Sequence, residues 1–135
     1  MKTLTKERNK IMEIHRLFIS GPKLSRDRFR AAVEAEGSIL QAFFPIPASI
    51  LAGGVNHLNL YVQDFYGTCR LDRNPYFEAD TGTAGVTVVC FDLGQRHAFP
   101  PAGFLRVFAA CPDLRFAFEY VPEEETAEDQ GTETV

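Results

Sequence analysis

The sequence has no tryptophan, no long apolar run and no recognisable cofactor motif. No stretch approaches the roughly 18 apolar residues that a membrane-spanning helix needs. The N-terminus runs into charged residues rather than into the apolar segment of a signal peptide. These absences predict a cytoplasmic protein that does not enter a membrane.

Metal-binding patterns are also missing. The three cysteines, Cys69, Cys90 and Cys111, are odd in number and form no C-x-x-C pair, and no H-x-x-x-H pair is present. Zinc frameworks depend on such spacing, because two ligands must converge from one turn. Cys90 and His97 flank one predicted loop and could meet. The ordinary interpretation of these cysteines is that they are reduced, mostly buried thiols. We therefore predict no metal and no cofactor.

Catalytic motifs are equally sparse. The glycines at 53–54 and 82–85 match neither a P-loop nor a dinucleotide fingerprint, and they indicate turns. Cys69, His57 and Asp64 form a triad in name only, since a nucleophile also needs a positioned base and an oxyanion pocket. Cys69 lies on a predicted strand at a position typical of the core. We therefore predict that the protein is not an enzyme.

What the chain does have is the composition of one globular domain with charged ends. Its 135 residues are 45% hydrophobic and include 12 phenylalanines. Nine of its 14 basic residues lie in the first thirty, whereas residues 122–135 hold six acids and no base. We predict a flexible basic arm over 1–11, a folded domain over 12–121 and a disordered acidic tail over 122–135. The charged ends either steer a charged partner or only keep the protein solvated.

Periodicity and turn residues predict the order of the elements. Residues 39–44 should be extended before Pro45, the stretch 74–85 is rich in turn residues, and Ser25 should be the N-cap of the first helix. The predicted strands cover 12–20, 68–73, 86–91 and 115–120, and the predicted helices cover 26–36, 55–65 and 102–110. This order predicts an α+β, ferredoxin-like two-layer sandwich: an antiparallel four-stranded sheet with helices on one face, one inserted helix, and strands 12–20 and 86–91 at the centre.

Several short segments, taken in order, resemble a known family. They are RLFISGP at 16–22, FFPIP at 43–47, FYGT at 65–68, FD at 91–92, the paired prolines at 100–101 and CPDLRFAFEYVPE at 111–123. Together they resemble the YubB-like domain of phages and conjugative plasmids. The resemblance implies a ferredoxin-like fold and a setting in mobile genetic elements of bacterial hosts, and it supplies no catalytic residue. The chain departs from the family at Cys69-Arg70, where the family has Lys-Trp.

One face of the predicted sheet is the candidate binding surface. If Leu17 points to the helices, Arg16 and Phe18 point away, and the same alternation places Arg70 and Arg115 on that open face. Three arginines on one face would suit carboxylates or phosphates. The plainer interpretation is an ordinary solvated sheet face.

These features favour binding over chemistry. The leading hypothesis is a non-enzymatic protein-binding module of a mobile genetic element, acting on a host protein or nucleoprotein complex as an anti-CRISPR-like inhibitor of host defence. The alternative is a nucleic-acid-binding accessory protein that uses the basic face and the N-terminal arm. The acidic tail favours the first, since it would repel phosphate. The sequence does not fix the oligomeric state.

Overall fold

The structure is a computed structural model that describes residues 13–78 and 85–122. The predicted basic arm and nearly all of the predicted acidic tail lie outside the described residues. The described elements are, in chain order, β1 (Ile14–Ser20), α2 (Lys23–Glu36), α3 (Ile39–Phe43), α4 (Ala48–Leu51), α5 (Val55–Tyr61), the π-helix η1 (Val62–Tyr66), β2 (Arg73–Phe77), β3 (Val86–Asp92), α6 (Ala102–Ala110) and β4 (Arg115–Tyr120).

The four strands form one antiparallel sheet in the order β2-β3-β1-β4. In β1, Ile14 lies opposite Asp92 of β3, and Arg16 lies opposite Glu119 of β4. Strands β1 and β3 are therefore central, as the sequence predicts. The α+β class and the antiparallel four-stranded sheet are confirmed. The ferredoxin-like assignment, which requires this strand order, stays a prediction at the level of the fold family.

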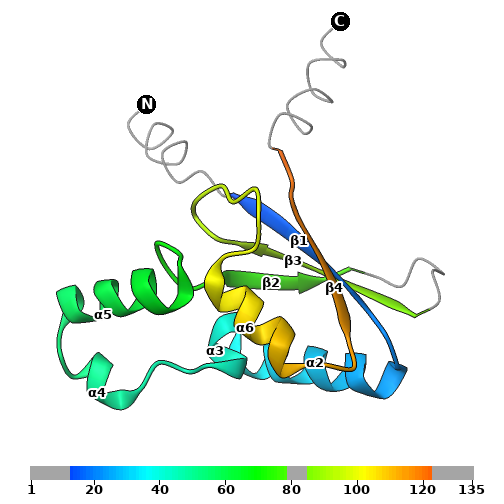
Figure 1. Cartoon of the computed structure of the whole chain (residues 1–135), viewed down its shortest axis with the longest axis horizontal. Coiled ribbons are helices and arrows are strands. Elements are labelled where there is room, and N and C mark those ends of the chain that lie inside the picture. The colour runs from blue at the N-terminus through cyan, green and yellow to red at the C-terminus, as the bar shows by residue number, and fades with distance from the viewer. Residues whose placement is uncertain (1–12, 79–84, 123–135) are drawn as a thin grey trace, which may run out of the picture.

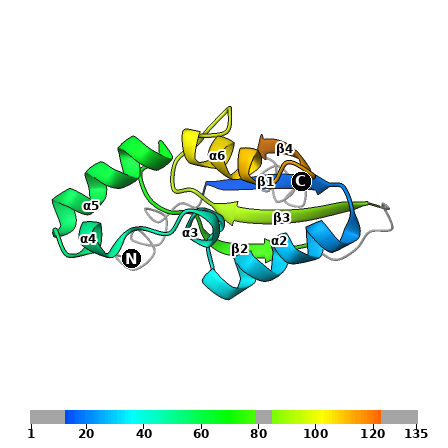
Figure 2. The same ribbon diagram turned by 60° about the horizontal axis from the view of Figure 1, so that its bottom comes forward.

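The core lies between the sheet and one layer of helices. Helices α2, α3 and α6 lie on the same face of the sheet (Figure 1), with α6 nearer β4 and α2 nearer β2 (Figure 2). Side chains in β1 alternate between buried and partly exposed, as expected for a strand covered on one face. The buried side chains at this interface include Leu17, Ile19, Phe29, Val33, Val89, Phe91, Phe104 and Val107.

The two main helices agree with prediction except at the start of α2. This helix begins at Lys23 with Pro22 as its N-cap residue, and no side chain caps it. Proline suits a helix start because its fixed φ is compatible with the first turn. Ser25 is therefore not the N-cap; its hydroxyl donates a hydrogen bond to the carboxylate of Asp113 instead. Gly37 ends the helix in the left-handed conformation, as predicted.

The prediction that residues 39–44 are extended is wrong, because residues 39–43 form helix α3. The carboxylate of Asp72 accepts hydrogen bonds from the backbone N–H groups of Ile39 at 2.7 Å and Leu40 at 3.0 Å. The hydroxyl of Ser38 also donates to this carboxylate, at 2.8 Å. Ser38 is the N-cap residue of this helix, and its hydroxyl accepts a hydrogen bond of 3.1 Å from the N–H of Gln41. Asp72, more than thirty positions away, adds partners for the next two N–H groups. The prolines follow only after the helix has ended.

The predicted strand over 68–73 is also wrong. The strand is β2, at 73–77, and it includes Pro75 beside a register shift between Arg73 and Tyr76. Proline is tolerated there because β2 is an edge strand, where a missing N–H need not break a ladder. Residues 68–72 form a loop, and Cys69 is exposed on it rather than packed in the core.

The predicted helix near 55–65 is confirmed as α5 followed by η1. With α4, α5 extends beyond the end of the sheet in both views (Figure 1) (Figure 2). No residue of α4 or α5 is buried. This projection lies within a stretch from 37 to 63 that has no Asp, Glu, Lys or Arg, and Leu51, Val55 and Leu60 on it are more than half exposed.

Candidate functional site

The face of the sheet opposite α2 and α6, here called the open face, carries the predicted site residues of β1. Leu17 and Ile19 are fully buried on the helix side. The alternation therefore directs Arg16, Phe18 and Ser20 to the open face, and all three are partly exposed. Within the described ranges 13–78 and 85–122, no helix lies on this face (Figure 1). The predicted orientation of Arg16 and Phe18 agrees with the structure.

Arg16 lies between two carboxylates. Its Nε atom is 3.3 Å from Glu78, and its terminal nitrogen donates to Glu119 at 2.8 Å. The thiol of Cys90, opposite Arg16 on β3, donates to Glu78 at 3.2 Å. Burial and the neighbouring carboxylate of Glu78 raise the pKa of this thiol, so it is a poor nucleophile. The centre of the open face is therefore charge-paired rather than basic.

Phe18 is the centre of a short apolar strip across three strands. It lies opposite Val88 of β3 and opposite Ala117 of β4. The guanidinium carbon of Arg16 is 6.0 Å from the centre of the Phe18 ring, at the outer limit of a cation–π contact. We define Val88, Phe18 and Ala117 as the apolar strip. An aromatic ring beside a paired arginine is typical of protein–protein interfaces.

Arg70 does not join this group, because it lies on the loop before β2. Its guanidinium pairs at 2.7 Å with Asp92, whose side chain is fully buried, and Arg73 contacts the same oxygen at 3.2 Å. Burial alone would raise the pKa of Asp92. The backbone N–H groups of Gly94 and Glu13 and the two guanidinium groups hold this pKa below its ordinary value. Arg70 therefore stabilises the end of β3.

Arg115 is exposed at the opposite end of the sheet. It lies opposite Ser20, whereas Asp92, the partner of Arg70, lies opposite Ile14. Six residues of β1 separate these positions, which corresponds to about 20 Å at the rise of a strand. The three arginines predicted to share the face therefore do not form one cluster.

The possible catalytic and metal pairs are not assembled. Cys90 belongs to the open face, whereas the ring of His97 lies 5.8 Å from that of His15, which is buried on the helix side. Cys69 contacts the backbone oxygen of Leu93, and the His57 ring lies against Gly53. No group of three or more His, Cys, Asp and Glu side chains among the described residues could hold a metal ion.

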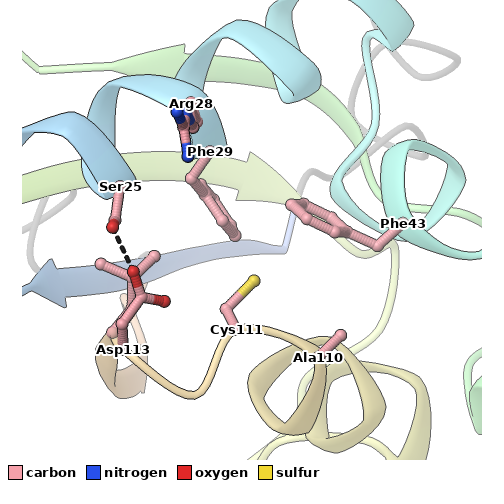
Figure 3. Close-up of a pocket in the computed structure, with 8 residues that line it drawn as sticks. Ser25, Arg28, Phe29, Phe43, Ala110, Cys111 and Asp113 are labelled. Atoms are coloured by element: carbon pink, nitrogen blue, oxygen red, sulfur yellow. Dashed lines mark hydrogen bonds between the residues drawn. The ribbon is translucent and has the colours of Figure 1, made fainter.

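A small pocket lies between α2 and the loop before β4 (Figure 3). Its volume is about 190 Å³, below the range of about 300–1,000 Å³ typical of small-molecule sites. Burial raises the pKa of the Cys111 thiol in its wall. Ser25 and Asp113 hydrogen-bond to each other across one side of it, as Figure 3 shows. The pocket is lined by Ser25, Arg28, Phe29, Phe43, Ala110, Cys111, Asp113 and Leu114.

Two features of the site were not found from the sequence. The pairing of Arg16 with Glu78 depends on strand β2, which the sequence did not place correctly. The pairing with Glu119 could have been found, because β4 was predicted correctly and the alternation that directs Arg115 to the open face directs Glu119 there as well. The register that brings Glu119 opposite Arg16 is the missing information.

No protein-family model, curated protein or solved structure matches this chain. No described helix is long and apolar enough to cross a membrane. The resemblance to the YubB-like domain therefore stays a prediction from the sequence.

Proposed function

We propose that this chain is a non-enzymatic protein-binding module of a mobile genetic element, acting as an inhibitor of a host defence complex in the manner of anti-CRISPR proteins. The observation that supports a protein partner is the apolar strip around Phe18, uncovered by any described helix and flanked by the charge-paired Arg16. Interface centres combine aromatic anchors with arginines and few unpaired charges. The mobile-element setting rests on the sequence resemblance.

The same geometry weighs against the nucleic-acid alternative. A phosphate that approaches Arg16 would also meet Glu78 and Glu119, both within 3.3 Å of its guanidinium. Removing the guanidinium from two carboxylates would offset much of the gain from a phosphate contact. Nucleic-acid binding would therefore have to use Arg115 and the N-terminal arm instead of Arg16.

The deciding experiment measures whether the chain relieves CRISPR interference in a bacterial host, scored as plasmid transformation efficiency. We expect the wild-type chain to restore transformation and Phe18→Ala to lose most of this effect. Leu24→Ala is the matched control, because Leu24 is 61% exposed on the helix side and lies outside the apolar strip. Purified complex and chain should then bind with only a shallow dependence on salt.

Three results would each contradict a part of the proposal. Full activity of Phe18→Ala would remove the open face as the contact surface. Binding to duplex DNA with a log–log salt slope near −0.9 per phosphate contact would favour the nucleic-acid-binding alternative. If the chain has no effect on any defence system tested, the inhibitor role is refuted. The open face would then be tested separately, by Phe18→Ala in a binding assay.

A further inference from the structure

The two edges of the sheet differ in how they are protected. Edge strand β2 contains Pro75 and a register shift, both of which discourage pairing with another strand. Edge strand β4 contains no proline, and its pairing with β1 has no register shift over all six residues from Arg115 to Tyr120. Strand β4 is thus the edge at which a further strand can be added.

The backbone of β4 is oriented for such an addition. The N–H of Val121 donates to the backbone oxygen of Ile14 at 2.9 Å, which fixes the alternation of hydrogen-bonded pairs along the two strands. In an antiparallel ladder, every second residue directs both backbone groups to the same neighbour. Residues 115, 117 and 119 therefore face β1, whereas Phe116, Phe118 and Tyr120 direct their N–H and C=O groups to the outer edge.

The side chains of β4 are self-complementary. When the segment RFAFE at 115–119 is paired antiparallel with a second copy about Ala117, Arg115 lies opposite Glu119 and Phe116 lies opposite Phe118. The phenylalanine pairs then occupy the hydrogen-bonded positions, which matches the groups that are free. The Arg115–Glu119 pairs occupy the non-hydrogen-bonded positions, where opposite side chains lie closest.

We infer that this chain forms a two-fold symmetric dimer by antiparallel pairing of its β4 strands. The two four-stranded sheets become one continuous sheet. The two-fold axis is perpendicular to this sheet, so the helices of both copies lie on the same side and the two open faces are joined. Ala117, which ends the apolar strip on β4, lies at the two-fold axis, so the strips of the two copies meet across the dimer.

Apolar side chains beside β4 support this arrangement. Phe116 and Phe118 face the helices yet remain partly exposed, because nothing described lies beyond the edge of β4. Phe108 of α6 stacks on Phe116 with ring centres 4.4 Å apart. Leu105 lies one turn earlier on the same flank of α6 and is 54% exposed. Figure 2 shows α6 beside β4 at this margin of the sheet. A second copy would cover this flank with the equivalent flank of its own.

The charge distribution is compatible with a dimer of this geometry. The six acids that follow Pro122 would repel the same segment of a second copy if the two were close. In antiparallel pairing about Ala117, each Pro122 is five residues from the axis, so the two are about 30 Å apart. This separation exceeds the Debye length of about 8 Å at physiological ionic strength. The acidic segments therefore begin well beyond the screening length from each other, whereas Arg115 and Glu119 lie directly opposite in the proposed pairing.

The test is sedimentation velocity of the full chain over a range of concentrations. The wild-type chain should dimerise. Arg115→Glu places like charges opposite each other twice and should raise the dimer dissociation constant by at least about tenfold. Leu105→Glu should do the same. Leu60→Glu is the matched control, since Leu60 is 59% exposed on the projecting α5.

Restoration by a second substitution is the stricter test. Combining Arg115→Glu with Glu119→Arg recreates both interchain pairs with reversed charge, and Arg16 keeps Glu78 as its partner, so dimerisation should return. Circular dichroism of each variant checks that the fold is retained. A wild-type chain that stays monomeric at every concentration would overturn the inference. So would a dimer that is lost in Leu60→Glu but unchanged in Arg115→Glu.

Discussion

The Nε2 atom of His15 accepts a hydrogen bond of 3.1 Å from the backbone N–H of His97. On the other side of the ring, Nδ1 lies 3.0 Å from the backbone oxygen of Glu13 and is placed to donate to it. Both bonds are made by a neutral imidazole, because a protonated Nε2 cannot accept. His15 is fully buried and ties the loop after β3 to β1. Burial lowers the pKa of His15, and burial likewise lowers the pKa of His97.

These two histidines predict an acid-sensitive fold. Their pKa values in the folded state lie below the ordinary value of about 6.5 that applies in the unfolded chain. The contribution of the neutral histidines to the free energy of unfolding is therefore fully present above about pH 6.5. It is lost as the pH falls through the folded pKa values, because the unfolded chain then binds more protons than the folded chain. We expect the free energy of unfolding, measured with urea, to be lower at pH 5 than at pH 7.

Two variants assign this pH dependence. His15→Gln keeps a hydrogen-bond acceptor but removes the titrating group, so the difference between pH 7 and pH 5 should shrink. His57→Gln, at an exposed position on α5, should leave the difference unchanged. Equal pH dependence in all three proteins would show that His15 does not contribute.

Asp72 should be among the most costly carboxylates to remove. It is buried and accepts three hydrogen bonds at the start of α3, from Ser38, Ile39 and Leu40. Asp72→Ala leaves these three donors at the buried start of α3 without their acceptor, so we expect a loss of about 2–4 kcal/mol. Asp72→Asn should lose less. Glu36→Ala, an exposed position on α2, serves as the control in the same urea titration and should change stability little.

The sequence predicted the elements whose signals are local and missed those that depend on distant contacts. Segments whose pattern is local, such as the central strand at 86–91 and the helix at 102–110, were predicted almost to the residue. Helix α3 was missed because Pro45 and Pro47 favoured an extended segment over the local N-cap signal of Ser38, and because the supporting carboxylate of Asp72 lies more than thirty residues away. The position of β2 was missed because Pro75, normally a turn signal, is accommodated by an edge strand with a register shift.

The candidate site follows the same rule. The alternation of β1 sufficed to direct Arg16 and Phe18 to the open face. The error at β2 misplaced Arg70, and it hid Glu78, one of the two carboxylates that offset the charge of Arg16. A basic face was predicted because single-strand patterns show which way a side chain points but not what lies beside it.

The reactivity of Cys90 should report on the charges around Arg16. Burial and Glu78 raise the pKa of this thiol, whereas Arg16 opposes them. Glu78→Gln should therefore speed alkylation of Cys90 by iodoacetamide at pH 8, by roughly twofold to tenfold, and Arg16→Gln should slow it. Peptide mass spectrometry separates Cys90 from Cys111, which lies in the pocket wall and should react at an unchanged rate. Equal rates for Cys90 in all variants would contradict the charge contacts seen on the open face.

Gly94 and Gly37 form a matched pair for testing the Arg70–Asp92 contact. Both have φ of +73°, so alanine at either position costs roughly 1–2 kcal/mol for the left-handed backbone. A Cβ at Gly37 would meet nothing within 4 Å, whereas a Cβ at Gly94 would lie 2.5 Å from the guanidinium carbon of Arg70. Gly94→Ala must displace Arg70 from Asp92, so its loss of stability should exceed that of Gly37→Ala by about 1 kcal/mol or more.

The double variant tests this contact directly. In an Arg70→Ala background the guanidinium is absent, so the further loss of stability from Gly94→Ala should fall to that of Gly37→Ala. Urea titration of the four proteins measures this coupling, and an additive double variant would show that Arg70 does not lie over Gly94.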